Sequence, residues 1–409
     1  SVGKNEDYAF KGSFSGQDAS DPTKSHKISI TYPFTLNEES ASLDRDHFYG
    51  LFGCVNDASF EYLDVVANLY LNYLTDSSGD FGLVYFGGLF GGTGTVSSSL
   101  NNVNVNSTLS VESMEPASED VLGDALYLGG IAGVAKIKEI SNSTLTSNIK
   151  CFDELNEKHY TSINNSNITP FASVTYFMKA IANASIGGAF GKLIFDNAAS
   201  VYSMNNKFNV GSFSIGANNS YFLIYKCNVG LFAGELANTA DETTLKLNEF
   251  TFSNISIKLI NVTEDATDSY LNFGGFIGYV SCENKTITFE KCFVNFNSDI
   301  NLDTSGGLVT NNIGLVFGYR KYNRTIFNNS YFVFEGFTIN DANSKTLNFG
   351  LLVGSVVGLS EYSSDESYFF TNSYIYEESG ELKLTKNGTS VINSNLLFGT
   401  KTLNFGMDI

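Results

Sequence analysis

The chain has 409 residues but no tryptophan, four prolines and three histidines, and only 16% of it is charged. So few prolines exclude Pro-rich linkers, and three histidines leave little material for a nucleophilic triad. We interpret His47, with Asp44 and Asp46 nearby, as part of a solvated acidic turn rather than a metal or acid–base cluster. HExxH, GxSxG, P-loop and EF-hand patterns are also missing. We therefore expect a protein that is not an enzyme, with no cofactor and no metal.

The cysteines show no CxxC spacing, which excludes the common zinc and thioredoxin-type motifs. Cys282 and Cys292 lie ten residues apart and are the candidate disulfide pair between neighbouring strands. An odd number of cysteines leaves at least one free thiol, so the compartment is only weakly indicated. All five are Cys54, Cys151, Cys227, Cys282 and Cys292.

Positive charge is scarce, and the formal net charge is −19. Such an acidic surface repels the phosphates of nucleic acids and the head groups of anionic membranes. No apolar run reaches 18 residues, and the richest, from Phe81 to Gly92, is too short to cross a bilayer. We predict no nucleic-acid partner and no membrane span.

The abundant residues are glycine (38), phenylalanine (35) and tyrosine (22), and the aromatic ones fit pleated sheets well. A short apolar motif, Gly-x-x-x-Gly, recurs at intervals of 36 to 58 residues. Its first copy, YGLFG, begins with Tyr49 in place of the leading glycine. Such spacing is typical of a repeat architecture. The seven later copies have the glycine pairs Gly87 and Gly91, Gly129 and Gly133, Gly187 and Gly191, Gly230 and Gly234, Gly274 and Gly278, Gly314 and Gly318, and Gly350 and Gly354.

The residues around the motif indicate how the copies stack. We expect the glycines to lie where two backbones approach closely or a strand bends. Polar turns and strand-like runs with period-two alternation follow, as in Leu145 between Thr144 and Thr146. An asparagine two residues before the first glycine would form a ladder of side-chain amides between copies. This lead-in occurs at Asn228, Asn272, Asn312, Asn348 and, in a ninth copy, Asn404.

The repeat predicts an all-β fold, a parallel β-helix or β-solenoid with about eight to nine repeats. Each interval would hold about two coils of roughly 20 residues. An eight-bladed β-propeller is the alternative, because its blades also take about 40 to 45 residues. The variable intervals and the ninth lead-in, which breaks ring closure, favour the solenoid.

We divide the chain into residues 1–46, an N-terminal cap or a lead-in segment, and residues 47–409, the repeat array. The run His26–Phe34 in the first part is predicted to be a strand. Insertions are expected near 151–170 and 364–388, in the two longest intervals, and their loops are the expected partner contacts. The ninth lead-in also suggests head-to-tail self-association.

The stretch GGIAGVAKIKEISNSTLTSN, from Gly129 to Asn148, resembles the GLUG-type glycine-rich repeat of surface adhesins, as do GGLFGG at Gly87 and GGFIGY at Gly274. GGAF at Gly187 and FFTN at Phe369 are distantly similar to motifs of polymorphic outer-membrane proteins. Both resemblances imply elongated β-helical regions displayed outside the cell, with a host-surface or matrix ligand.

N-x-Ser/Thr sequons are frequent and suggest a glycosylated secreted or cell-surface protein with N-linked glycans. In an organism without N-glycosylation the same pattern would have no meaning. A further sequon, at Asn167, is the weakest acceptor because Pro170 follows it. The candidates are Asn106, Asn142, Asn164, Asn183, Asn218, Asn254, Asn261, Asn284, Asn323, Asn328 and Asn387.

These features together predict an extracellular structural or adhesive repeat protein, either a self-assembling glycosylated filament or sheath subunit or a monomeric adhesin stalk. The alternative is a β-helical polysaccharide hydrolase or lyase, which would align carboxylates from adjacent coils. The sequence offers only scattered candidates for that role: Asp120, Asp124, Asp153 and Glu154.

Overall fold

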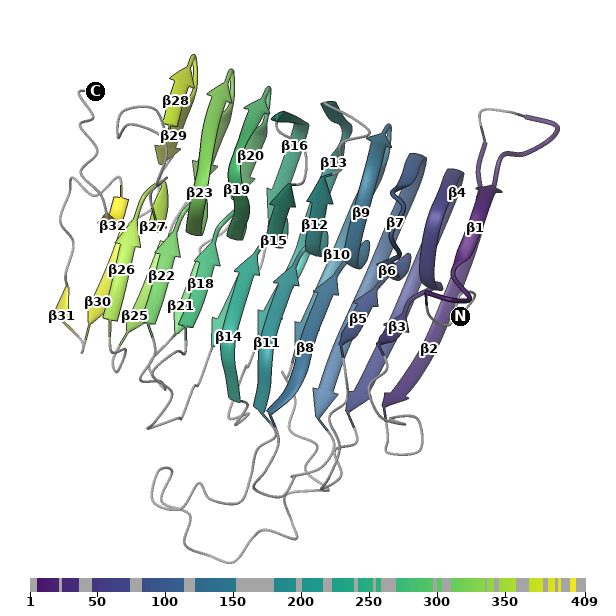
Figure 1. Ribbon diagram of the computed structural model, residues 1–409, viewed down its shortest axis with the longest axis horizontal. Coiled ribbons are helices and arrows are strands. Elements are labelled where there is room, and N and C mark those ends of the chain that lie inside the picture. The colour runs from purple at the N-terminus through teal and green to yellow at the C-terminus, as the bar shows by residue number, and fades with distance from the viewer. Residues whose placement is uncertain are drawn as a thin grey trace, which may run out of the picture.

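A computed structural model shows an all-β chain of stacked parallel strands (Figure 1). It describes residues 6–21, 24–36, 46–73, 83–113, 122–151, 180–195, 201–215, 223–238, 242–252, 255–258, 270–296, 300–303, 310–334, 337–341, 346–357, 368–377, 382–386, 389–390 and 398–401.

The smaller of two sheets has eight strands, one for each copy of the glycine motif. They lie side by side in chain order, from β3 at the N-terminal end to β26 (Figure 1). All their pairings are parallel. The strands are β3 (His47–Tyr49), β5 (Val84–Gly87), β8 (Leu122–Gly129), β11 (Ala180–Gly187), β14 (Leu223–Gly230), β18 (Tyr270–Gly274), β22 (Thr310–Gly314) and β26 (Thr346–Gly350).

The larger sheet has 24 strands and forms the other walls of the coil. Its N-terminal half contains β1 (Phe10–Ser15), β2 (His26–Leu36), β4 (Phe52–Tyr73), β6 (Phe90–Thr93), β7 (Ser98–Ser113), β9 (Ala132–Ser141), β10 (Thr144–Cys151), β12 (Phe190–Phe195) and β13 (Val201–Ile215). Next come β15 (Ala233–Asn238), β16 (Glu242–Phe252), β17 (Ile255–Lys258), β19 (Ile277–Glu290), β20 (Phe293–Phe296), β21 (Ile300–Asp303), β23 (Phe317–Asn328), β24 (Tyr331–Phe334) and β25 (Phe337–Asp341). The last are β27 (Val353–Val357), β28 (Tyr368–Thr371), β29 (Tyr374–Glu377), β30 (Leu382–Lys386), β31 (Thr389–Ser390) and β32 (Phe398–Lys401).

The register shows that one motif interval makes one coil. Gly87 pairs with Gly129, Gly129 with Gly187, and Gly187 with Gly230. The prediction of two coils of roughly 20 residues per interval was therefore wrong. The predicted β-solenoid is confirmed and the propeller is excluded, because propeller blades are antiparallel and radial. Among the described strands, only β30 and β31 pair in the antiparallel sense.

The core consists of inward residues that stack on their equivalents in the next coil. Phe232 and Phe276, for example, stack with ring centroids 5.0 Å apart. Phe289 and Phe327 do the same at 5.3 Å. No coil could bury such residues alone, so each depends on its neighbours.

One corner of the coil needs a left-handed backbone. Asn102, Asn142, Asn329 and Asn372 there have φ values of +47° to +54°, which asparagine tolerates better than most residues. Asn142, Asn329 and Asn372 are each followed by a serine. In one of these pairs the serine is buried, and Ser330 Oγ donates to the carbonyl of Phe289 at 3.0 Å. Asn-Ser pairs in this repeat therefore specify corners.

The N-terminal segment forms the end level of the larger sheet. The predicted strand His26–Phe34 is confirmed as β2, and both β1 and β2 pair with β4. Phe10 packs on Phe52 at 5.1 Å between ring centroids, covering the core. Gly12 has φ +101° at a register shift in β1, and Pro33 removes one N–H from β2. Bulges and prolines at a sheet edge oppose further strand pairing.

The C-terminal part corrects two predictions. Residues of the supposed insertion 364–388 form β28, β29 and β30, which pair with β23, β24 and β25 and so continue the coil. Phe398 pairs with Val353, so Gly399 holds the position of Gly354, and the ninth motif is NLLFG rather than the later NFG at Asn404. The other insertion, 151–170, lies outside the described residues except for Cys151.

Candidate functional site

The glycine motif forms a seam where the two sheets meet. In each copy from Gly87 onward, the first glycine ends a strand of the smaller sheet and the second follows the first residue of a larger-sheet strand. A Cβ on Gly278 would lie 2.6 Å from the backbone N of Val229 and 2.7 Å from the carbonyl O of Gly234. Among described glycines only Gly12 has a positive φ. Close backbone approach, as predicted, therefore explains the repeat glycines.

Two rows of side chains line the seam on the face of the strands that points away from the core. The asparagines of the smaller sheet form the predicted ladder. Asn272 Nδ2 donates to Asn228 Oδ1 at 2.8 Å, and Asn312 Nδ2 donates to Asn272 Oδ1 at 2.7 Å. Asn348 continues it at 2.7 Å, and Asn228 contacts Ser185 Oγ at 3.4 Å. Asn228, Asn272 and Asn312 are buried, so their amide groups need these hydrogen-bond partners.

Aromatic rings replace asparagine in the N-terminal coils. Phe48, Tyr85 and Tyr127 occupy the same row and stack at 4.6 Å and 5.4 Å between centroids. On the larger-sheet row the aromatic residues are C-terminal instead, with Tyr279 and Tyr319 at 5.5 Å. The aromatic lining thus changes sheets along the solenoid.

A charged pair lies where the aromatic lining changes sides. Lys192 and Glu235 are register partners, and Lys192 Nζ lies 2.8 Å from Glu235 Oε1. Their side chains are 25% and 11% exposed. Burial alone would lower the pKa of Lys192, but the charge and hydrogen bond of Glu235 raise it. Burial raises the pKa of Tyr127, while Lys192 opposes that shift.

We call Tyr127, Lys192, Glu235, Tyr270 and Tyr279 the seam cluster. Burial raises the pKa of Tyr270 to about 12, with smaller contributions from Tyr279 and Glu235. Burial likewise raises the pKa of Tyr85, whose hydroxyl lies 3.4 Å from Asp46 Oδ2. At neutral pH these tyrosines are neutral donors, and Glu235 is paired with a lysine. The cluster can form hydrogen bonds but holds no second carboxylate facing Glu235 among the described residues.

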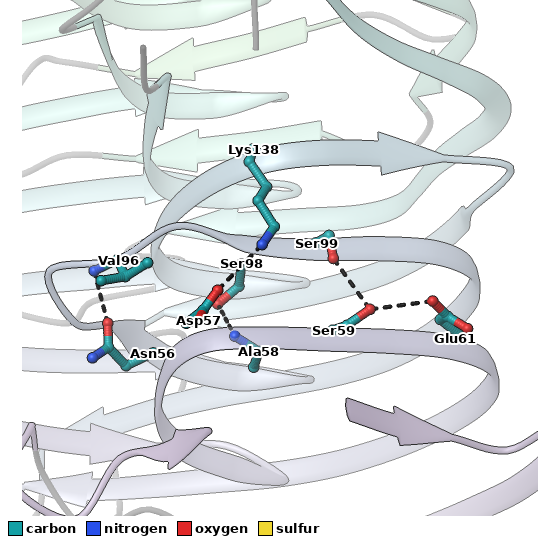
Figure 2. A network of polar contacts seen from close by, with 9 residues as sticks. All are labelled: Asn56, Asp57, Ala58, Ser59, Glu61, Val96, Ser98, Ser99 and Lys138. Atoms are coloured by element: carbon teal, nitrogen blue, oxygen red, sulfur yellow. Dashed lines mark hydrogen bonds and ion pairs between the residues drawn. The ribbon is translucent and has the colours of Figure 1, made fainter. Parts of the chain in front are cut away.

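Polar contacts also connect coils at a corner near the N-terminal end (Figure 2). Asn56 Oδ1 accepts the N–H of Val96 at 2.7 Å, and Ser98 Oγ accepts the N–H of Ala58 at 3.1 Å. Lys138 reaches across two coils to Asp57 Oδ1 at 3.2 Å. Exposed pairs of this kind contribute little, about 0–1 kcal/mol. We interpret these contacts as structural ones that hold neighbouring coils together at this corner.

The predicted disulfide is absent, and all five cysteines are free and buried. Cys282 Sγ lies 3.5 Å from the carbonyl O of Leu236, whereas Cys292 Sγ lies 3.3 Å from that of Leu245. Each thiol points at a different strand of the preceding coil. Although they are only ten residues apart in the sequence, the two cysteines therefore lie on different walls of the coil.

The sequons differ in accessibility. The side chains of Asn106, Asn142 and Asn183 are exposed, while Asn328 is half-buried. Ser330, the third residue of the Asn328 sequon, is buried, and its hydroxyl donates to the carbonyl of Phe289. Asn284 and Asn323 lie in β19 and β23 without described side chains. Outside the described residues lie Asn164, Asn167, Asn218, Asn254, Asn261 and Asn387.

None of the four candidate acids of an enzyme has a described side chain. Asp124 lies in β8 without a described side chain, and Asp120, Asp153 and Glu154 lie outside the described residues. The parts of the chain described here contain no group of three or more His, Cys, Asp or Glu residues able to hold a metal. No helix among them could serve as a membrane span.

Sequence reasoning missed the seam cluster, because its members come from four different coils between Tyr127 and Tyr279 and meet only through register. A signal existed: Lys192, Glu235 and Tyr279 each directly follow the second glycine of a motif. A scan against protein-family models finds no match for this chain, and searches of curated proteins and of solved structures find none either.

Proposed function

We propose that the chain is an extracellular structural or adhesive protein in which the solenoid is a stiff scaffold for its outer faces. The supporting observation is the continuity of the ladders. The asparagine row and the core rows pass through successive coils in register. Eight rungs about 4.8 Å apart make a stack about 34 Å long. In the asparagine row the polar side chains bond to the neighbouring coils, which is a structural role.

Between the two forms of this function, an adhesin stalk is favoured over a head-to-tail filament. The N-terminal edge carries the Gly12 bulge and Pro33, both of which oppose pairing with another strand. The ninth lead-in at Asn404, which suggested an assembly edge, is replaced by the motif ending at Gly399. Exposed Asn106, Asn142 and Asn183 are the best candidates for N-linked glycans.

The polysaccharide hydrolase or lyase is supported less well. Such chemistry needs two carboxylates on either side of the scissile bond. In the seam cluster Glu235 is paired with Lys192 instead.

Surface labelling tests the proposal. An antibody against the folded protein should bind intact cells of the source organism, and glycosidase should increase the electrophoretic mobility of the protein extracted from them. Labelling only after permeabilisation would contradict an extracellular role. Sedimentation and negative-stain microscopy of the purified chain should show single short particles, whereas long filaments would favour the polymer form.

A further inference from the structure

One wall of the solenoid carries a regular array of outward side chains, which we call the grid face. It consists of every second residue of Lys27–Pro33, Asp64–Tyr70, Asn104–Ser110 and Thr144–Lys150. These runs belong to β2, β4, β7 and β10 and pair residue by residue without a register shift. Rungs lie about 4.8 Å apart and successive outward side chains about 6.6 Å apart. Sixteen side chains are thereby held at fixed positions, and all but Ser110, which is buried, are at least partly exposed.

The grid face differs in chemistry from the rest of the chain. Ten of its sixteen residues are Ser, Thr or Asn, and three are charged, with a net charge of +1. A face with so small a net charge does not suit a cation or a nucleic acid. It suits a partner that is itself uncharged and rich in hydrogen-bonding groups.

Much of the hydrogen-bonding capacity of this face points to solvent. The first row is tied together, since Asn104 Nδ2 donates to Asp64 Oδ1 and Thr144 Oγ1 donates to Asn104 Oδ1, both at 2.6 Å. In the middle rows, Asn106 is exposed and Thr146 is half-exposed. Within the described part of the chain neither has a side-chain hydrogen bond. Amide and hydroxyl groups there can both donate and accept.

An aromatic residue lies at the edge of the array. Tyr70 is 41% exposed and pairs with Pro33, which is also exposed. A tyrosine ring offers an apolar surface together with a polar tip. The apolar face of a sugar ring can pack on such a ring while its hydroxyls reach the neighbouring polar rows.

We propose that the grid face binds an uncharged polysaccharide. Sugar hydroxyls match the Ser, Thr and Asn groups, the small net charge is compatible with a neutral polymer, and Tyr70 supplies the apolar contact. The face extends about 20 Å along the strands, so several sugar units can bind at once through individually weak contacts. This inference rests on the proposed adhesive function and names its ligand class. Asn106, a sequon residue in the grid, would obstruct the face if it carried a glycan.

The full chain, expressed in bacteria without glycans, should co-sediment with particles of at least one neutral polysaccharide among cellulose, chitin and mannan. Thr146→Lys, which places a charge in the centre of the grid, should weaken binding about tenfold. Tyr70→Ala should weaken it similarly. Thr95→Lys is the matched control, because Thr95 is exposed outside the grid, and it should bind as the parent does.

Binding to none of the three polymers would overturn the proposal, as would equal losses with Thr146→Lys and Thr95→Lys. A second copy of the chain and an ice surface are the other possible occupants of the grid face. The proposal would also fail if Thr146→Lys left polymer binding unchanged but abolished dimerisation of the chain or its adsorption to ice. Protein from a glycosylating host gives a second readout: Asn106→Gln should bind better than the parent. Surface labelling with no polysaccharide binding would overturn this inference and leave the proposed location intact.

Discussion

The amide of Asn272 donates from Nδ2 to Oδ1 of Asn228, a residue 44 positions earlier, at 2.8 Å. Asn312 makes the same bond to Asn272, so each buried amide serves two neighbours. The ladder therefore joins successive coils through side-chain amides that are buried away from solvent.

Replacing Asn272 by alanine removes two of these bonds at once. Asn228 Oδ1 and Asn312 Nδ2 would both lose their partners, and each unsatisfied buried group costs about 1–3 kcal/mol. We expect a loss of about 2–4 kcal/mol in the free energy of unfolding, measured by urea titration. Asn106→Ala, on the exposed grid face, should change it by about 0.5 kcal/mol or less. Equal effects would show that the ladder contributes nothing.

Gly278→Ala tests the seam. The new Cβ would meet the backbone of Val229 and Gly234, and neither can move as a flexible side chain would. We expect destabilisation of about 3 kcal/mol or more, at the upper end of overpacking effects. Gly211→Ala is the control, because its Cβ would come closest to the side-chain Oδ1 of Asn148, at 2.8 Å. A small loss of stability in Gly278→Ala would mean that the two sheets can move apart at the seam to accommodate the methyl group.

The Lys192–Glu235 pair should show coupling. Removing either partner leaves the other charge largely buried, and we expect a cost of about 2–3 kcal/mol for Lys192→Met or Glu235→Leu. The double replacement should be more stable than either single variant, because no unpaired charge remains. Additive losses in a double-mutant cycle would contradict this coupling.

Alkaline pH should unfold the protein through its tyrosines. Burial raises the pKa of Tyr49 and of Tyr270 to about 12, above an unfolded value of about 10. The folded state therefore favours the protonated phenol. This stabilisation is complete below pH about 10 and is lost as the pH rises toward about 12. Urea midpoints should fall across that window, together with a rise in tyrosinate absorbance. In Tyr270→Phe the urea midpoint should fall less over this pH range. An unchanged fall would mean that the ionisation of Tyr270 does not cause the loss of stability.

The cysteines should resist thiol reagents until the chain unfolds. Burial raises the pKa of Cys54 and of Cys227 to about 12, so almost no thiolate forms at pH 8. Intact-mass analysis after iodoacetamide should show no label on the native protein and five labels in urea. Labelling of only three cysteines in urea without a reductant would indicate a disulfide.

Much of the architecture could be predicted from residues at fixed offsets. The glycine pairs located the seam, and the lead-in asparagines located the ladder, because one chemical requirement recurs at every coil. Coil size could not be predicted, since β4 is a single run of 22 residues whose bends leave little sequence signal. The ninth motif was misplaced because Asn395 stands where earlier copies have glycine.

Contacts between coils were harder to predict. The sequence spacing of Cys282 and Cys292 says nothing about the wall on which each thiol lies. Lys192 and Glu235 meet only because β12 and β15 align with no register shift. The grid face could not be predicted for the same reason, because each of its rows contains one residue from each of β2, β4, β7 and β10, which are far apart in the sequence.

The register between β18 and β22 places Gly274 on Gly314 and Asn272 on Asn312. If a gene lost the codons for residues 274–313, Phe273 would join directly to Gly314, and the next asparagine above Asn272 would be Asn348. Every wall would stay continuous and both ends would be unchanged. The length of such a protein is thus open to change by recombination between like segments, one coil at a time.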